Sequence, residues 1–144
     1  YMNIYASCNY SKGKKNSDQH CGEAKHDSKI DTNFLEKISC HIHFKYNNIG
    51  EILPSCPFQT IKDCEINHSK LTSLQQEALR TIKVLNLNQA SLVLLRKKDL
   101  TELFKILNRF SKEQVNAQIQ KLNNLDTFPR FIDMLLYYIK QKKR

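Results

Sequence analysis

The sequence predicts an all-α protein, a compact bundle of five to six short helices with a flexible N-terminal tail. Three observations lead to this prediction. The 144 residues, 40% of them hydrophobic, are enough for one domain with its own core. Only 3 Gly and 3 Pro are present, which argues against a turn-rich β fold. From residue 71 onward, apolar residues recur at helical spacing with few interruptions.

The tail is predicted over residues 1–32, which carry scattered apolar residues and no sustained helical or strand period. Such a segment buries too little surface to offset the entropy lost on ordering it. Because the chain begins at Tyr1 rather than Met, we expect it to be a piece of a longer protein. No apolar run approaches the ~20 residues that span a bilayer, so we expect a soluble protein that does not contact a membrane.

The bundle is predicted over residues 33–144. Its first helix is expected at 33–46, where apolar residues follow a helical spacing, at Phe34, Leu35, Ile38 and Ile42. The segment 47–70 is expected to be a long irregular loop, because Pro54 and Pro57 exclude a continuous helix.

Cap-like residues predict where the later helices start. The helix expected over 71–86 has Thr72 and Gln75 at capping-box spacing near its start. The dense apolar cluster at 90–95 is predicted to be a separate, buried short helix. Further starts are expected at Asp99, at Ser111, and at Asp126 or Thr127.

The net charge of +9 lies entirely in the last part of the chain. Residues 70–144 carry 15 basic and 6 acidic residues, a difference of +9. A field of this sign attracts acidic peptides or a nucleic-acid backbone. Two interpretations stay open: a solvated, lysine-rich surface, or a functional basic face that includes Lys97 and Lys98.

Motifs of enzyme chemistry are missing from the sequence. It has no Gly-rich phosphate loop, no G-x-S-x-G, no H-E-x-x-H and no Rossmann fingerprint. The carboxylates of the helical half are scattered among Lys and Arg, as in surface ion pairs. We therefore predict a non-enzymatic protein without a cofactor.

A cluster of Cys and His residues resembles a metal site, with Cys40, His43, Cys56, Cys64 and His68 as its members. The spacing of Cys64 and His68 would place two ligands one helical turn apart, and zinc favours such ligands. However, a short-spaced ligand pair is missing, and a free Cys commonly fills a core as a small hydrophobe. We favour the core-filling interpretation. Five cysteines without a CxxC pair indicate reduced thiols in a cytosolic or nuclear protein.

The string LNLNQASLVLLRKKDLTELFKILNRFSKEQVNAQIQKL at 85–122 resembles the integrase-binding domain of lens-epithelium-derived growth factor and hepatoma-derived-growth-factor-related proteins. The matching features are a leucine-rich helix, the pair Lys97 and Lys98, and KILNRF before a Gln-Val helix. FLEKISCHIHFKYN at 34–47 is similar to that domain's first helix. The resemblance implies a TFIIS N-terminal-like bundle, without catalysis, that binds short disordered segments of nuclear chromatin and transcription proteins.

The resemblance also implies a partner-binding site formed by two loops. Phe110 matches the family's aromatic anchor, with Arg109 and Lys112 beside it, and Asn48 and Ile49 match the other loop. This sequence departs from the family at Lys112, where the family has an apolar residue, and at the first loop, which lacks the family's Asp. We therefore expect a nuclear adaptor for acidic, apolar-anchored motifs, without carrying over the family's particular partners.

Three alternatives remain. Phe110 is instead a core residue under the turn, in which case Phe110→Ala unfolds the protein rather than only abolishing binding. The basic half binds DNA or RNA directly, using the polar residues of 111–123. Finally, the chain is a structural bundle in a larger assembly, with 92–95 as an interface.

Overall fold

The structure, a computed structural model, describes residues 40–111 and 132–142, together with residues 15, 19, 20, 24, 28, 113–115, 117 and 120. The predicted tail therefore lies outside the described residues except at five positions. The same holds for residues 33–39 of the predicted first helix, for the helix start predicted at Asp126 or Thr127, and for Lys112.

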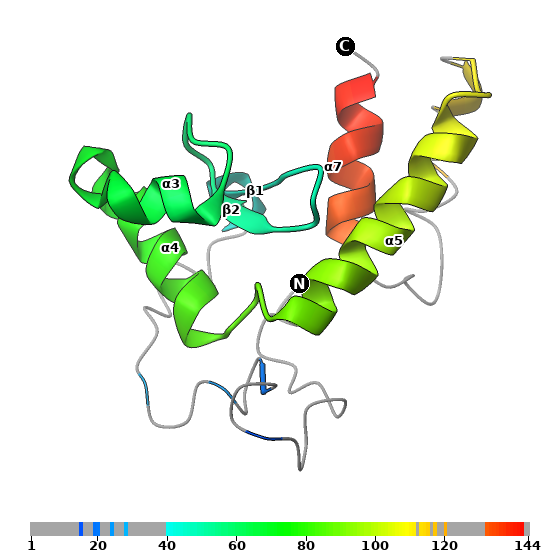
Figure 1. The fold of residues 1–144 in the computed structure, drawn as a ribbon. Helices are drawn as coiled ribbons and strands as arrows, with labels where there is room; N and C mark the ends of the chain where they lie inside the picture. The colour runs from blue at the N-terminus through cyan, green and yellow to red at the C-terminus, as the bar shows by residue number, and fades with distance from the viewer. Residues whose placement is uncertain are drawn as a thin grey trace.

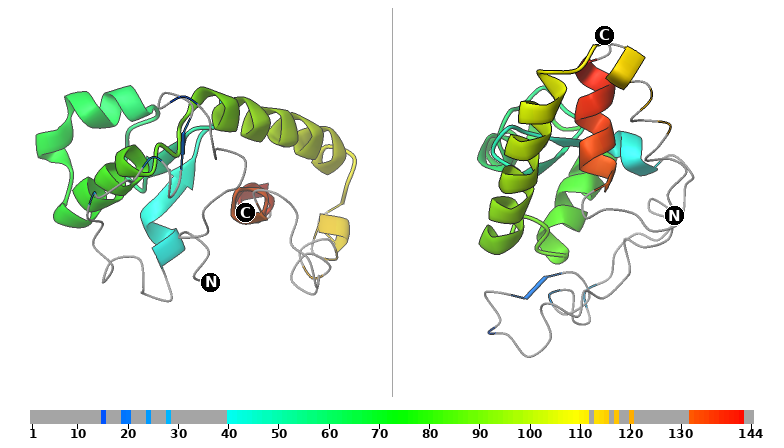
Figure 2. Two further views of the ribbon diagram at one scale, coloured as in Figure 1. Left: turned by 90° about the horizontal axis from the view of Figure 1, so that it is seen from below. Right: turned by 90° about the vertical axis from the view of Figure 1, so that its right-hand side faces the viewer.

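The described residues form a mostly helical fold around a small β-hairpin. In chain order the elements are η4 (Cys40–His43), β1 (Phe44–Tyr46), β2 (Ile52–Pro54), α3 (Ile61–Ile66), η5 (His68–Lys70), α4 (Ser73–Val84), α5 (Ala90–Leu107) and α7 (Ile132–Lys142). Helices α3 and α4 lie on one side of the hairpin, and α5 and α7 lie on the other (Figure 1). The view from below gives the same arrangement (Figure 2).

The hairpin corrects the prediction of a purely α-helical fold. Strands β1 and β2 pair antiparallel, with Lys45 opposite Leu53, where the sequence predicted the end of a helix over 33–46. Aromatic residues of β1 favour a strand, and the following turn closes because Gly50 adopts a φ of +91° and its N–H donates to the Asn47 carbonyl (3.0 Å). The turn therefore determines the structure of residues 44–54, where the last residues of the predicted helix form β1 instead.

The prediction of an irregular loop at 47–70 was also wrong, because this segment contains β2, α3 and η5. Pro54 ends β2 and Pro57 lies between the strand and α3, so the prolines exclude one continuous helix but not two short elements. Helix α3 begins after Thr60, whose side chain accepts a hydrogen bond from the Asp63 N–H (3.1 Å). Its 6 residues are too few for a periodic pattern to reveal.

Helix α4 confirms the helix predicted over 71–86 and its capping box. The Gln75 N–H donates to the Thr72 hydroxyl (3.4 Å), and the Thr72 N–H donates to the Gln75 side chain (3.0 Å). At the other end, Asn86 adopts a left-handed φ of 47° and the Leu87 N–H donates to the Ile82 carbonyl (2.9 Å). This Schellman ending sets the direction of the chain toward α5.

Helix α5 joins two elements that the sequence predicted as separate helices, at 90–95 and from Asp99. Arg96, Lys97 and Lys98 between them are good helix formers, and nothing there breaks the helix. Its start is capped by Gln89, whose side-chain oxygen accepts from the Ser91 N–H (2.7 Å) and the Leu92 N–H (3.3 Å). Asp99 is therefore an interior residue of the helix rather than its cap.

The predicted start at Ser111 is confirmed by two reciprocal contacts. The Ser111 N–H donates to the Gln114 side chain (2.8 Å), and the Gln114 N–H donates to the Ser111 hydroxyl (3.4 Å). The hydroxyl itself donates to the Glu113 carboxylate (2.7 Å), which lowers the pKa of that exposed carboxyl.

Apolar contacts gather on the two sides of the hairpin. One cluster joins β2, α3 and α4, with Leu53, Cys56, Cys64, Leu71 and Leu79 buried. Another joins α5 and α7, with Leu100, Met134 and Tyr138 buried and Tyr46 of β1 packed against them.

Candidate protein-binding surface

The turn of the hairpin lies directly on α5. A Cβ atom added at Gly50 would be 2.5 Å from the Val93 carbonyl oxygen and 2.9 Å from the Lys97 nitrogen. Contacts below 3.0 Å require movement of the helix backbone, so only glycine fits here. The close approach fixes where the preceding residues, Asn48 and Ile49, lie relative to α5.

Arg96 holds this turn in place from inside the protein. Arg96 is 2% exposed, and its guanidinium donates to the Gly50 carbonyl (2.8 Å), to the Leu87 carbonyl and, more weakly, to the Asn88 side chain (3.4 Å). A buried guanidinium needs such acceptors, because each unsatisfied donor would lose its hydrogen bonds to water. The hairpin turn and the α4–α5 connection are therefore joined through one side chain.

Asn88 adds a second link between the same segments. Its side-chain oxygen accepts from the Ile52 N–H and its side-chain nitrogen donates to the Ile52 carbonyl, both at 2.8 Å. The amide thus pairs with the edge of β2 as a neighbouring strand would. Together with Arg96 it makes a polar junction, which we define as Gly50, Asn88 and Arg96.

Two apolar side chains next to this junction face solvent. Ile49, in the turn, is 47% exposed, and Leu94, on the first half of α5, is 68% exposed. Asn48 is exposed too, and its side-chain oxygen accepts from the Tyr138 hydroxyl of α7 (3.3 Å). The turn is therefore held from both helices, while its apolar residue remains available.

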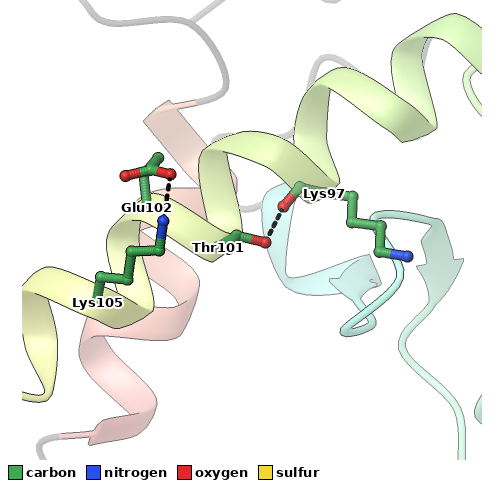
Figure 3. Close-up of polar contacts among 4 residues, drawn as sticks. All are labelled: Lys97, Thr101, Glu102 and Lys105. Carbon is green, nitrogen blue, oxygen red and sulfur yellow. Dashed lines mark hydrogen bonds and ion pairs between the residues drawn. The ribbon is translucent and has the colours of Figure 1, made fainter.

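Lys97 and Lys98 are exposed beside these apolar residues, as the basic-face interpretation requires. Neither lysine is within an ion pair among the residues that the structure describes. By contrast, Lys105 pairs with Glu102 (2.9 Å). Figure 3 shows this pair next to Thr101, whose hydroxyl donates to the Lys97 carbonyl (2.9 Å). The Lys97 side chain points away from the Glu102–Lys105 pair.

We call Ile49, Leu94, Lys97 and Lys98 the hairpin–α5 surface. Lys97 and Lys98 follow Leu94 by three and four residues, so all three share one face of the helix. An apolar side chain next to cations without ion pairs suits an acidic segment that has an apolar residue of its own.

Phe110 lies in the turn between α5 and the helix start at Ser111. Its side chain is half-buried and packs against the cluster of Val115 and Ile139, as the alternative core interpretation describes. Arg109 beside it is exposed. Leu107 lies ten residues beyond Lys97, about 15 Å along the helix axis. The turn of Asn48 and Ile49 therefore packs beside the first half of α5, whereas Phe110 lies beyond the last residue of this helix.

Within the Cys and His cluster, Cys56 and Cys64 contact each other. Cys56 and Cys64 are buried with their Sγ atoms 3.5 Å apart, whereas His68 is exposed on η5. Among the described residues, no group of three or more His, Cys, Asp and Glu side chains could hold a metal ion. Burial raises the pKa of the Cys64 thiol to about 12, consistent with a core position.

The junction residues were missed by sequence reasoning. Arg96 directly precedes Lys97 and Lys98, so the sequence alone suggests one exposed basic run. Asn88 reads as one more polar residue of a loop. The only available signal was Gly50, since an isolated Gly after two Asn residues marks a turn with positive φ.

The described part of the N-terminal segment also contacts this region. The Asn86 side-chain nitrogen donates to the Gln19 carbonyl (2.7 Å), and His20 is fully buried. A short stretch of the predicted tail thus packs near the α4–α5 connection.

Comparison with protein-family models, with curated proteins and with solved structures finds no match for this chain. Among the described residues, no helix is both long and apolar enough to cross a membrane.

Proposed function

We propose that this chain is a non-enzymatic protein-interaction module that binds a short, acidic segment with an apolar anchor on the hairpin–α5 surface. The observation that carries the proposal is Leu94, 68% exposed on the same helix face as Lys97 and Lys98. Neither lysine has an ion-pair partner among the described residues.

The physical basis is the combination of an apolar contact with charge. Covering a leucine side chain contributes about 1.5–3 kcal/mol when burial is complete. The two lysines add attraction for carboxylates, which mainly raises the association rate and selects the sign of the partner's charge. Because the polar junction already fixes the turn and the helix, the hairpin–α5 surface loses little conformational entropy when a partner binds.

The finer assignment, a TFIIS N-terminal-like bundle acting as a nuclear adaptor for chromatin or transcription proteins, is part of the same proposal. It is supported by the helix at 90–107, which falls within the stretch 85–122 that carries the resemblance. The hairpin differs from what the resemblance implies, and the Phe110 side chain packs against Val115 and Ile139. For this reason we assign the binding role to Leu94 and Ile49 rather than to Phe110.

The proposal is tested with a fluorescein-labelled amphipathic peptide of about 15 residues, which carries Leu at helical spacing among Asp and Glu. Fluorescence anisotropy measures its dissociation constant for the wild-type chain. Replacing Leu94→Ser is expected to weaken binding at least about tenfold. The matched control is Ile66→Ser, which removes an apolar side chain that is 71% exposed on α3, away from this surface.

The charge contribution is tested by the double variant Lys97→Ser/Lys98→Ser. We expect about threefold weaker binding at low salt and no difference at high salt, where the attraction is screened. Lys62→Ser/Lys70→Ser is the control, because these two lysines are exposed on α3 and η5. If both double variants lose affinity equally, or if Ile66→Ser acts like Leu94→Ser, binding is not specific to this surface and the proposal is wrong.

The alternative function is direct binding of DNA or RNA, favoured by the same exposed lysines and by the net charge of +9. A duplex titrated under the same conditions separates the two. Nucleic-acid binding would give a linear fall of log affinity with log salt concentration, and Leu94→Ser would leave it unchanged.

A further inference from the structure

Two buried thiols face each other in the cluster between β2, α3 and α4. Cys56 follows β2 and Cys64 lies in α3, and their Sγ atoms are 3.5 Å apart. Both are free, with Cys64 fully buried and Cys56 9% exposed. Their neighbours are the apolar residues Leu53, Leu71 and Leu79.

The hairpin fixes the connection that brings the two cysteines together. At its start, the Ser55 N–H donates to the His43 carbonyl and the Cys56 N–H to the Pro54 carbonyl, both at 2.8 Å. Ser55 and Cys56 are thereby tied to the end of the hairpin.

At the other end of the connection, the Asn47 side chain donates to the Gln59 carbonyl (3.0 Å), and the Ile61 N–H donates to the Glu51 carboxylate (3.4 Å). That carboxylate also accepts from the Asn47 side chain (2.7 Å). Two segments, each attached to the hairpin by its own hydrogen bonds, therefore supply the two thiols. These attachments keep the two Sγ atoms close to each other.

We propose that Cys56 and Cys64 are a reversible oxidation site at which a hydroperoxide converts the dithiol into a disulfide that ties α3 to the hairpin. This modification is independent of the peptide-binding function proposed above. It uses residues on the opposite side of the hairpin from α5.

The reaction proceeds in two steps with named atoms. The Cys56 sulfur, the more exposed of the two, attacks the peroxide, so that the O–O bond breaks and Cys56 sulfenic acid and an alcohol or water form. The Cys64 sulfur then attacks the sulfenic sulfur, the S–S bond forms, and the oxygen leaves as water with the Cys64 proton. Two electrons pass from the thiols to the peroxide in total.

Burial determines how the site behaves before oxidation. The pKa of Cys64, raised by burial to about 12, keeps this thiol protonated at neutral pH, so it is a poor nucleophile toward peroxide and reacts with the more electrophilic sulfenic sulfur that forms beside it. A disulfide requires the sulfur atoms to approach to about 2.05 Å from their present 3.5 Å. This small movement closes a short loop and restricts the unfolded chain.

The experiment uses the full chain with Cys8→Ser, Cys21→Ser and Cys40→Ser, so that only the proposed pair remains. The folded protein is treated with one equivalent of hydrogen peroxide, blocked with N-ethylmaleimide and digested with trypsin without reductant. Because Lys62 lies between the two cysteines, cleavage there separates peptides 46–62 and 63–70. We expect mass spectrometry to find them joined by a disulfide and released by dithiothreitol.

A second measurement is the thermal midpoint of the same samples. We expect oxidation to raise it by about 10 °C, a loop-closure estimate, and dithiothreitol to restore the original value. Cys64→Ala in the same background is expected to give neither the joined peptides nor the shift. The proposal is overturned if the folded protein yields only Cys56 sulfinic or sulfonic acid, or if both thiols are still reduced after peroxide and are recovered as N-ethylmaleimide adducts. It is also overturned if the two peptides become joined only when the protein is oxidised in urea.

Discussion

The two ends of helix α5 are held by different kinds of interaction. At its beginning, the polar junction of Gly50, Asn88 and Arg96 joins the helix to the hairpin through hydrogen bonds. Further along, the contacts are apolar and aromatic. Phe104 of α5 meets Tyr138 of α7 edge to face with ring centroids 5.3 Å apart.

This difference explains which side chains are left for a partner. Hydrogen bonds fix the first half of α5, so Leu94 and Ile49 are not needed for packing and remain exposed. At the other end, apolar burial holds the helices together, and Phe110 is used for it. The binding surface is therefore expected where directional polar contacts, rather than apolar packing, determine the geometry.

The largest expected effect comes from removing the charge of the junction. Arg96→Met keeps a long side chain but leaves the Gly50 and Leu87 carbonyls without their guanidinium donor. Because each buried, unsatisfied polar group costs about 1–3 kcal/mol, we expect a loss of about 3 kcal/mol of unfolding free energy. Urea denaturation followed by circular dichroism measures it.

Arg80→Met is the matched control for this prediction. Arg80 is exposed on α4, and among the residues that the structure describes it pairs only with Glu77 (3.4 Å), so its replacement is expected to change stability by less than about 0.5 kcal/mol. Equal effects of the two substitutions would show that the junction does not hold α5 by its hydrogen bonds.

A smaller effect is expected at the other end of α5. Phe110→Ala removes a half-buried ring from the cluster with Val115 and Ile139. Replacing a fully buried Phe by Ala typically costs about 3–5 kcal/mol of unfolding free energy. Because Phe110 is only half-buried, we expect a loss of about 2 kcal/mol here. Binding of the acidic peptide to the folded protein is expected to stay within about twofold of wild type.

Stability and peptide affinity measured together decide between the two assignments of Phe110. If Phe110→Ala abolishes peptide binding while the urea midpoint stays unchanged, the resemblance located the anchor correctly and the hairpin–α5 surface is not the binding site.

Sequence patterns predicted the elements that local signals specify. The capping box of Thr72 and the start at Ser111 need only residues three positions apart, so they were visible in the sequence. Helix α4 has a regular apolar face and was found for the same reason. The hairpin was missed because its two strands have only 3 residues each, and the first follows directly after the helical spacing that ends at Ile42.

The candidate site was predicted only in part because it depends on contacts between distant segments. Lys97 and Lys98 were identified from charge alone and are exposed. The role of Arg96 depends on Gly50, 46 positions earlier, and no local pattern carries that information. Phe110 illustrates a different limit of local patterns. Its place between two helices suggested a binding anchor, whereas its side chain packs against Val115 and Ile139.

The smallest effect on stability at neutral pH is expected for two buried acidic groups, Cys64 and Tyr138, which lie on the two sides of the hairpin. At alkaline pH these groups are expected to have a distinct effect on stability. Burial raises the pKa of Cys64 to about 12 from 9.0, and that of Tyr138 to about 12 from 10.0. The unfolded chain releases these protons at lower pH than the folded protein does. The stability that both groups contribute is therefore complete below pH 9 and is lost as the pH rises toward 12.

Urea midpoints measured between pH 8 and pH 11.5 test this comparison of the two sides. Tyr138→Phe removes one hydroxyl, which donates to Asn48 (3.3 Å), and is expected to cost less than about 1 kcal/mol at pH 8. Above pH 10 its loss of stability should become shallower than that of wild type. Cys64→Ala should flatten the decline already between pH 9 and 10. If the urea midpoints of both variants fall with pH as steeply as those of the wild type, other groups cause the alkaline unfolding. The ionisation of Cys64 and Tyr138 then does not destabilise the protein.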